Sequence, residues 1–419
     1  MSDAAGSFPV HPGLSGFRRA VTKELWEDIV PFWCDYGPDH EQGGFIGRLT
    51  NGREVVRDAP KGLILNTRIL WTFSALFQVR PDPFFRELAD RALEYFTERF
   101  VDPLYGGAYW LLDARGQVIN NMKKIYGQAF VIYSLSEYFA AFGDSEALRL
   151  ARETFDLIEK HNRDAVHGGY FEASNRNWTI AEQMRLSERD LNERKSMNTH
   201  LHLMEAYTNL YRVWPDPQLR QALQELLAVI RERIAEPHSH HFFLFFDDEW
   251  HPRSSAISFG HEIEASWLLD EAVKVSGTEP SPAVRELSVQ LADTVLREGF
   301  AGDFGIYSEC SREGKCSASL QWWQQAEAVV GLLNAFQLCG EERYWRAALR
   351  AWEFIERHVV DRRQGEWFYE ITSERKPNLK LFKICEWKGP YHNTRACLEI
   401  LRRLEKLNPN QEEKLCEPG

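Results

Sequence analysis

Apolar residues along this chain alternate between two spacings. Short segments with a period of about two contain turns of the type Gly-Gly-aromatic, and each is followed by a stretch with a period of about 3.6. The turns read GGFIGRL at 43–49, GGAYWLLD at 106–113 and GGYFEAS at 168–174, followed by the degenerate forms FFLFFDDEW, FGIYSE and GEWFYEI. The chain is therefore built from six repeats of about sixty residues each.

The helical stretches fall into two sets. One set is apolar around most of its circumference, as in residues 129–142 and 202–214. The other set carries many Arg and Glu side chains on one face; it comprises residues 21–33, 84–100, 146–161, 218–234, 283–298 and 344–359. A charged face favours water, whereas a helix that is apolar all round favours burial. We therefore expect six outer and six inner helices.

Alternating outer and inner helices with short links predict an all-α fold, an (α/α)6 barrel with short β-hairpin loops at one end. An open solenoid is the structural alternative. Solenoids usually have shorter repeats and polar caps at both ends, and the last apolar helix, TRACLEILRRL, has no evident cap. The closed barrel is the favoured architecture.

Composition supports one catalytic domain over residues 1–419, with loose ends at about 1–14 and 408–419. The chain is 44% hydrophobic and contains no low-complexity linker. A formal net charge of -12 and the lack of a basic run argue against nucleic-acid or anionic-membrane partners. No secretion signal or membrane-length apolar run is evident, and the seven cysteines form no CxxC pair. We expect a cytoplasmic protein and a monomer.

Polar residues gather at the starts of the predicted inner helices, which in a closed barrel face one end of the central cavity. They read NTR (66–68), YGQ (126–128), NTHLH (198–202), HEIE (261–264), WWQQAE (322–327) and YHN (391–393). Helix residues three or four apart share a face, so Asn198 with His202, and His261 with Glu264, can point into one pocket. Each residue alone could instead cap a helix or satisfy buried backbone. Six similar starts favour a functional cluster.

A metal centre is the sharper alternative, because imidazole and carboxylate groups at helical spacing bind zinc or iron in many enzymes. The pattern does not fit well: His261 and Glu264 form no HExxH motif, and His200 lies about 160° from His202 around an ideal helix. No GxGxxG or GxxxxGK[ST] motif is present. We expect no metal, nucleotide or other cofactor.

Histidine, arginine and tryptophan residues together favour a carbohydrate pocket. Tryptophan rings stack on the apolar faces of sugars, while arginine and amide or carboxyl groups bind hydroxyls. A histidine pair suits removal of a proton next to a carbonyl, because imidazole can act as base in one form and acid in the other.

Four segments then carry a family resemblance: KSMNTHLH, SFGHEIEASWLL, WWQQAEA and EWKGPYHNTRACLE, with GLILNTRILWTF upstream. In this order, they resemble the cellobiose 2-epimerases of the N-acylglucosamine 2-epimerase superfamily, over nearly the whole chain. The resemblance implies an (α/α)6 barrel and an isomerase that acts on a small sugar such as cellobiose or lactose.

Carried over residue by residue, the resemblance implies roles for eleven residues. His261 and His392 would be the catalytic acid/base pair, with His202 a third essential histidine. Arg68 would hold the oxygen that gains charge. The remaining sugar-binding residues would be Tyr126, Asn198, Glu264, Trp323, Trp387, Ser187 and Asp190, the last two from an aperiodic segment (175–195) whose place the sequence does not fix.

The implied reaction opens the ring of the reducing-end glucose, removes the C2 proton, forms a cis-enediolate and returns a proton on the opposite face. Protonation at C1 would instead give a ketose, and relatives that act on N-acylglucosamine share the fold. A glycoside hydrolase using two of Asp190, Glu264 and Glu327 is the alternative from another class, and a non-catalytic sugar-binding barrel is a further one. His161, His167 and His240 lie outside the helix starts and are expected to be dispensable.

Overall fold

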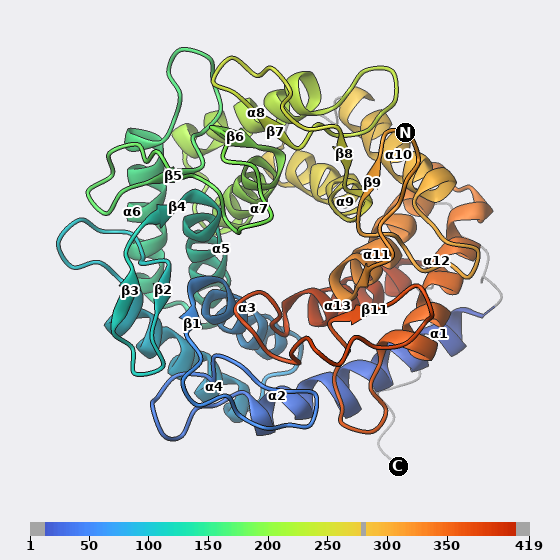
Figure 1. Ribbon diagram of the computed structural model, residues 1–419, viewed down its shortest axis with the longest axis horizontal. Helices are drawn as coiled ribbons and strands as arrows, with labels where there is room; N and C mark the ends of the chain where they lie inside the picture. Colours follow the sequence, from blue (N-terminus) through green and yellow to red (C-terminus); the bar gives the residue numbers. More distant parts are fainter. Residues whose placement is uncertain (1–12, 278–281, 408–419) are drawn as a thin grey trace, which may run out of the picture.

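Six inner helices form a closed ring in the computed structural model, which describes residues 13–277 and 282–407 (Figure 1). They are α3 (Leu63–Val79), α5 (Ile125–Phe142), α7 (Met197–Val213), α9 (Phe259–Ser276), α11 (Trp322–Cys339) and α13 (Tyr391–Leu407). Each packs against the next, and α13 packs against α3. The closed (α/α)6 barrel is confirmed, and the solenoid alternative is wrong.

The outer helices surround this ring and match the predicted charged stretches. They are α1 (Leu14–Lys23), α2 (Val30–Tyr36), α4 (Pro83–Tyr95), α6 (Ser145–His161), α8 (Pro217–Val229), α10 (Pro282–Glu298) and α12 (Glu342–Phe354). The π-helical segment η1 (Glu24–Ile29) joins α1 to α2, and η2 (Phe96–Phe100), η3 (Ile230–Ile234) and η4 (Ile355–Val359) end α4, α8 and α12. Asp82, Asp144 and Asp216 cap the N-termini of α4, α6 and α8, accepting hydrogen bonds from backbone N–H groups.

Helix α13 differs from the other inner helices, because it is strongly amphipathic. Arg402 and Glu405 at its far end are exposed, whereas Arg395 and Arg403 are buried. The rule that inner helices are apolar around most of their circumference therefore fails for α13, which carries a buried charge on the side that faces its neighbours.

Short strands connect neighbouring repeats at the end of the barrel where the inner helices begin. Five of them precede inner helices: β1 (Lys61–Gly62), β4 (Lys123–Lys124), β6 (Lys195–Ser196), β8 (Ala256–Ile257) and β10 (Leu320–Gln321). Their antiparallel partners come from the next repeat: β2 (Leu111–Leu112), β5 (Ala173–Ser174), β7 (Phe245–Phe246), β9 (Cys310–Ser311) and β11 (Glu370–Ile371), with β3 (Val118–Asn120) beside β2. In register, Lys61 is opposite Leu112 and Lys123 is opposite Ser174. A bridge between Leu49 and Ile384 links the first and last repeats.

The Gly-Gly turns lie directly after the outer helices, and both glycines adopt positive φ. A Cβ atom on Gly169 would lie 2.4 Å from the Trp250 ring and 2.6 Å from His200 Nε2, so no other residue fits there without a shift. In the degenerate repeats His240 (φ 62), Phe304 (φ 70) and Glu366 (φ 63) adopt the same left-handed region without glycine. The turn geometry therefore persists where its sequence signature fades.

Buried lysine–aspartate pairs tie several of these turns to the start of the inner helices. The Nζ atom of Lys123 lies 3.1 Å from Asp102 Oδ2, and both side chains are buried. Equivalent pairs join Lys61 to Asp39, Lys195 to Asp164 and Lys383 to Asp361 at 2.8, 2.7 and 2.8 Å. Burial lowers the pKa of Lys123 to about 8, even with Asp102 beside it.

Replacing Asp102 with alanine is expected to reduce the free energy of unfolding by about 3–5 kcal/mol, because Lys123 would remain buried without a counter-ion. Urea denaturation measures this change. Asp58→Ala, at an exposed aspartate of the first repeat, is the control and should change stability by less than about 0.5 kcal/mol. A similar small loss for Asp102→Ala would contradict the role given to the buried pair.

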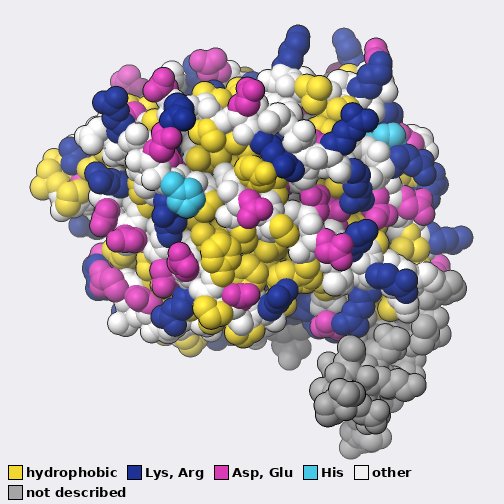
Figure 2. All heavy atoms as spheres, turned by 90° about the horizontal axis from the view of Figure 1, so that it is seen from below, with side chains coloured by type: hydrophobic (Ala, Val, Ile, Leu, Met, Phe, Trp, Pro, Cys, Tyr) yellow, Lys and Arg dark blue, Asp and Glu magenta, His cyan; other side chains and the backbone are white. Residues whose placement is uncertain are grey.

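On the flank in Figure 2, acidic and basic side chains are interspersed around apolar areas, without a single basic patch on that face. None of the helices in residues 13–277 and 282–407 is long and apolar enough to cross a lipid bilayer. The predicted loose ends fall outside the described residues except for Gly13 and Leu14, and Leu14 is buried.

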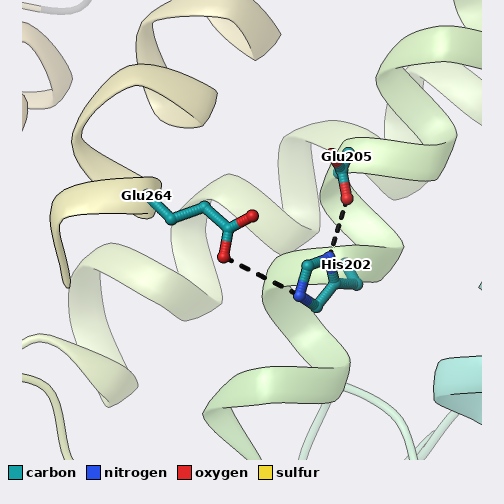
Figure 3. A group of neighbouring side chains, drawn as sticks. All are labelled: His202, Glu205 and Glu264. Atoms are coloured by element: carbon teal, nitrogen blue, oxygen red, sulfur yellow. Dashed lines mark hydrogen bonds and ion pairs between the residues drawn. The ribbon is translucent and has the colours of Figure 1, made fainter. Parts of the chain in front are cut away.

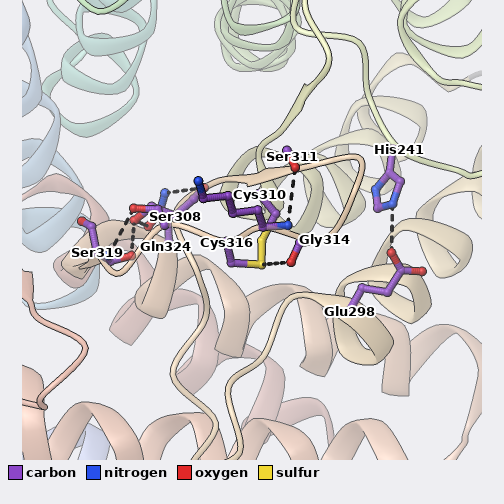
Figure 4. The surroundings of a disulfide bond; sticks show 11 residues. His241, Glu298, Ser308, Cys310, Ser311, Gly314, Cys316, Ser319 and Gln324 are labelled. Atoms are coloured by element: carbon purple, nitrogen blue, oxygen red, sulfur yellow. Dashed lines mark hydrogen bonds and ion pairs between the residues drawn. A yellow bond between two sulfur atoms is a disulfide. The ribbon is translucent and has the colours of Figure 1, made fainter.

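A disulfide joins Cys310 to Cys316 across one hairpin (Figure 4). The residues on either side of it line the mouth of the barrel: Ser308 donates a hydrogen bond to Gln324 Oε1 at the start of α11, and Ser319 donates one to Glu370. Among the described residues, Cys34, Cys339, Cys385 and Cys397 are free thiols. The spacing of the cysteines in the sequence does not predict this disulfide.

Candidate active site

A cavity of about 990 Å³ opens at the end of the barrel where the inner helices begin. All eleven predicted site residues line it: Arg68, Tyr126, Ser187, Asp190, Asn198, His202, His261, Glu264, Trp323, Trp387 and His392. The helical spacing of the NTHLH and HEIE segments accounts for Asn198, His202, His261 and Glu264, which project from the first turns of α7 and α9.

Two of the three histidines are each oriented by a glutamate. His202 Nδ1 lies 2.7 Å from Glu205 Oε2, one turn along α7 (Figure 3), and His392 Nδ1 lies 2.7 Å from Glu327 Oε1 on α11. A carboxylate accepts a hydrogen bond from Nδ1–H, which leaves Nε2 of the same ring as the atom with a free lone pair. Within the part of the chain that the structure describes, neither Nε2 atom has a hydrogen-bond partner.

His261 is held differently. Its Nδ1 atom lies 2.7 Å from the hydroxyl oxygen of Ser258, at the N-cap of α9, and its ring packs against Trp323 with 4.8 Å between the centroids. The His392 ring packs against the same tryptophan at 5.4 Å. Both histidines therefore contact the same tryptophan ring.

His202 and His392 are buried and His261 is half-buried, and this withdrawal from water keeps all three imidazoles neutral. It lowers the pKa of His261 to about 3, an effect to which His202 adds. It also holds the pKa of His202 below its usual range and that of His392 well below it, with Arg68 adding to the effect at His392. A neutral imidazole can accept a proton, so the site is ready for base chemistry at neutral pH.

Arg68 supplies positive charge at the side of the cavity. Its guanidinium donates hydrogen bonds to the Trp387 carbonyl at 2.9 Å and to the Tyr126 hydroxyl at 3.0 Å, and it lies over the Phe130 ring. Its Nε atom is buried without a partner among the described residues. The side chain is thus held rigidly, with hydrogen-bonding capacity left over.

Glu264 is the carboxyl group of the site that most readily holds a proton. Burial and the nearby Glu327 raise its pKa well above the usual value. One oxygen accepts a hydrogen bond from Arg395, while Oε2 is buried without a hydrogen-bond partner in residues 13–277 and 282–407 and lies 4.0 Å from His202 Nε2 (Figure 3). A protonated Glu264 can donate this hydrogen to an oxygen in the cavity.

Trp387 and the segment that carries Ser187 and Asp190 form the outer part of the cavity. The Trp387 ring contacts Trp110 and Tyr126, with centroids 5.9 and 6.4 Å apart. Asp190 Oδ2 accepts hydrogen bonds from the Ser187 backbone and hydroxyl at 2.8 and 2.9 Å. The aperiodic segment therefore reaches the cavity mouth as a compact turn.

Two groups of side chains have spacings suitable for a metal ion, and they share Glu264: one adds His202 and Glu205, the other Glu327 and His392. In the first group His202 Nδ1 is already hydrogen-bonded to Glu205, and in the second His392 Nδ1 is already hydrogen-bonded to Glu327. The Arg395 guanidinium contacts all three glutamates and is the cation at their centre. A positive guanidinium thus already occupies the place among the glutamates that a metal cation would need, so these groups fit a metal poorly even though Glu264 Oε2 has no partner among the described residues.

Other polar residues at the helix starts serve the backbone of the barrel. They bond to nearby turns or to their own helix: Asn66, Gln128, His200, Glu262, Gln325 and Asn393. His200, for example, accepts a hydrogen bond from the Tyr170 backbone, on the side away from the cavity. The interpretation that a polar residue caps a helix or satisfies buried backbone is therefore correct for about one residue in each repeat.

Sequence reasoning missed the groups that orient the histidines. Glu205 follows His202 by three residues and Ser258 precedes His261 by three, so helical spacing could have indicated both. Glu327 is predicted as part of the helix-start cluster and as a candidate hydrolase acid. It lies behind His392, where it also accepts a hydrogen bond from Trp267, rather than on the cavity wall. Nothing local in the sequence marks Arg395 as buried.

Comparison with known proteins agrees with this geometry. The family model for N-acylglucosamine 2-epimerase (GlcNAc 2-epimerase) matches residues 44–396. A cellobiose 2-epimerase of Bacteroides fragilis is 43% identical over 92% of this chain and 98% of its own length. The solved structure of a cellobiose 2-epimerase of Spirochaeta thermophila is 40% identical and superposes with a TM-score of 0.88 over 95% of this chain and all of its own. That of Bacillus thermoamylovorans is 35% identical and superposes with a TM-score of 0.89 over 93% of this chain and all of its own. The chain belongs to the N-acylglucosamine 2-epimerase family.

Proposed function

We propose that this protein is a cellobiose 2-epimerase, which converts the reducing-end glucose of β-1,4-linked disaccharides such as cellobiose and lactose into mannose. The observation that carries the proposal is a pair of neutral histidines, His261 and His392, which line one cavity and both pack against Trp323. Inversion at a carbon needs proton transfer on both faces, and two separate bases provide it.

Binding places the reducing-end sugar beside the histidines. Trp323 and Trp387 offer aromatic surface to the sugar rings, and Asn198 and Tyr126 offer hydrogen bonds to hydroxyls. Ser187 and Asp190, farther out, would contact the second sugar. The cavity of about 990 Å³ is at the upper end of the usual range for small-molecule sites, which suits a disaccharide.

The reaction begins with ring opening, which exposes an aldehyde at C1 and acidifies the hydrogen on C2. One histidine removes that proton, and the cis-enediolate carries negative charge on O1 and O2. Arg68 and a protonated Glu264 stabilise this charge in a site sheltered from water. After rotation about the C2–C3 bond, the second histidine, which has taken up a proton from solvent beside the negative enediolate, donates that proton to the other face. The first histidine then releases the C2 proton to solvent, which restores both neutral rings. His202, held by Glu205, would bond to a sugar oxygen beside them.

Two related outcomes use the same groups. Protonation at C1 instead of C2 would give a ketose, so a slow isomerase activity is expected alongside epimerisation. N-acylglucosamine would need room for its acyl group at C2, next to the histidines. A hydrolase is not favoured, because Glu327 is engaged by His392 and Arg395 behind the cavity wall.

We also propose that the protein acts as a cytoplasmic monomer without metal or nucleotide. The buried cations Arg68 and Arg395 supply positive charge where the enediolate and the glutamates carry negative charge. Addition of EDTA should therefore leave the activity unchanged.

The acid limb of the pH profile is expected to lie below pH 6.5, roughly the ordinary pKa of histidine. A histidine base works only when neutral, and burial lowers the pKa of His261 to about 3 and keeps those of His202 and His392 below the usual range. The neutral forms therefore persist as the pH falls past 6.5. The measurement is kcat/KM for cellobiose against pH, which reports the free enzyme. A limb at or above about pH 6.5 would contradict neutral, desolvated bases.

Product analysis tests the function itself. The purified protein is incubated separately with cellobiose, lactose, N-acetylglucosamine and mannose, and the products are separated by chromatography. We expect glucosyl-mannose from cellobiose and galactosyl-mannose from lactose, at much higher kcat/KM than any product of the monosaccharides. Release of free glucose would indicate a hydrolase, and conversion of mannose alone would indicate a monosaccharide isomerase; either would overturn the proposal.

A further inference from the structure

Arg395 is a buried charge that bonds to three carboxylates at once. It projects from the second turn of α13, with 2% of its surface exposed, and does not line the 990 Å³ cavity. Its guanidinium donates hydrogen bonds to Glu205 on α7, to Glu264 on α9 at 2.5 Å and to Glu327 on α11 at 2.7 Å. It therefore joins three inner helices to a fourth.

Aromatic and charged groups enclose this guanidinium. It lies over the rings of Trp267 and Tyr391 at 4.8 and 4.4 Å from their centroids. The titratable and charged groups that interact with it directly come from four helices: Glu205 and His202 from α7, Glu264 from α9, Glu327 from α11, and Tyr391 and His392 from α13. Tyr126 and Tyr133 from α5 lie near it, and Arg68 from α3 lies over the same Tyr391 ring. Arg395 and Glu205 also line a second cavity of about 590 Å³, on the side of Arg395 and its three glutamates that faces away from the sugar site. We call Arg395 and these glutamates the charged layer.

We propose that Arg395 is a positioning residue that fixes the protonation of the catalytic histidines through the glutamates behind them. The inference rests on the function proposed above and deepens it. Arg395 keeps Glu205 and Glu327 ionised. Each ionised glutamate accepts a hydrogen bond from Nδ1–H of its histidine, so Nε2 of His202 and of His392 carries no proton and faces the sugar.

The charges in this layer explain why a cation is needed there. Burial alone raises the pKa of a carboxyl group, yet the pKa of Glu205 is lowered to about 2, because Arg395, His202 and Tyr391 outweigh burial. At Glu327, burial raises the pKa and Arg395 is the largest opposing influence. Without Arg395, Glu327 would take up a proton and could donate it to His392 Nδ1, which would move the imidazole proton to Nε2 and remove the base.

Arg395→Gln removes the charge, and Arg395→Lys keeps it but loses the fork that reaches several carboxylates at once. We expect Arg395→Gln to lower kcat at neutral pH by at least about 100-fold and to move the acid limb of kcat upward by at least about one pH unit. The direction follows because glutamates without Arg395 ionise only at higher pH. Arg395→Lys should lie between this variant and the wild type.

Arg403 offers a matched control. It is also buried on α13, but it bonds to Asn334 and Gln337 and forms an ion pair with Glu399 at 3.5 Å, and among the described residues none of these three bonds to a histidine. Arg403→Gln and Arg403→Lys should leave the shape of the pH profile unchanged, whatever they do to thermal stability. If the Arg395 variants lowered kcat equally at all pH values, with a lower Tm, Arg395 would be merely structural and the proposal would be overturned.

A second measurement needs no variant and no turnover. Long-range ¹H–¹⁵N NMR of ¹⁵N-histidine-labelled wild-type protein reports which ring nitrogen carries the proton. We expect His202 and His392, assigned with His202→Gln and His392→Gln, to be Nδ1–H tautomers at neutral pH. An Nε2–H tautomer at His392 would overturn the proposal even if the Arg395 variants did not fold. Absence of epimerisation by the wild type would contradict the proposed epimerase activity, whereas the tautomers would still test the role of Arg395 separately.

Discussion

Replacing His392 with alanine is expected to lower kcat for epimerisation of cellobiose by about 100-fold to 10,000-fold, the usual contribution of a general acid or base. The variant would lack the imidazole that is bonded to Glu327 and packed against Trp323, and no other base lies in its place. His261→Ala should cause a loss of similar size. Initial rates of glucosyl-mannose formation at saturating cellobiose measure both effects.

Isotope exchange separates the two histidines. If each serves one face of the sugar, each variant should still exchange the C2 hydrogen of one epimer with D2O, and the two variants should differ in which epimer exchanges. His167→Ala is the control, because His167 is exposed in a turn outside the cavity and the variant should keep full activity. Near wild-type epimerisation by either His392→Ala or His261→Ala would contradict the assignment.

Arg68→Met is expected to lower kcat by about 100-fold to 1,000-fold, as loss of one donor to a developing oxyanion commonly does. The methionine keeps the apolar contact with Phe130 but loses the positive charge and the hydrogen bonds to Tyr126 and Trp387. Because the negative charge arises only in the enediolate, KM should change much less than kcat.

Arg80 provides the control for this change, since it lies just past the other end of the same inner helix and is exposed. Arg80→Met should retain wild-type kinetics. A variant of Arg68 in which KM rose while kcat stayed constant would show that the arginine binds ground-state sugar only, which would contradict its role in stabilising the enediolate.

Most of the barrel could be predicted from sequence because its signals are local. Period-3.6 apolar stretches, Gly-Gly turns and the repeat itself depend on neighbouring residues, and the same is true of the face shared by Asn198 and His202. The degenerate turns at His240 and Phe304 could be placed only by the repeat, because residues other than glycine adopt the left-handed conformation there.

The charged layer behind the site could not be predicted in the same way. Arg395 occupies a helix with Arg and Glu on it, which reads as a solvated face, and its partner Glu205 is 190 residues away. Buried Lys123 and Asp102 are likewise hidden, since each residue type is usually exposed. Burial of a charge depends on long-range pairing, and a single sequence carries no record of that pairing.

The most direct test of the central claim is to incubate the purified protein with cellobiose in D2O and to follow C2 of the reducing sugar by NMR. We predict loss of the C2 proton signal together with appearance of a mannose residue that carries deuterium at C2, since the proton leaves to a histidine and returns from solvent-exchanged histidine. A mannose product that fully retained its C2 hydrogen, or the absence of any change at C2, would contradict epimerisation through an enediolate.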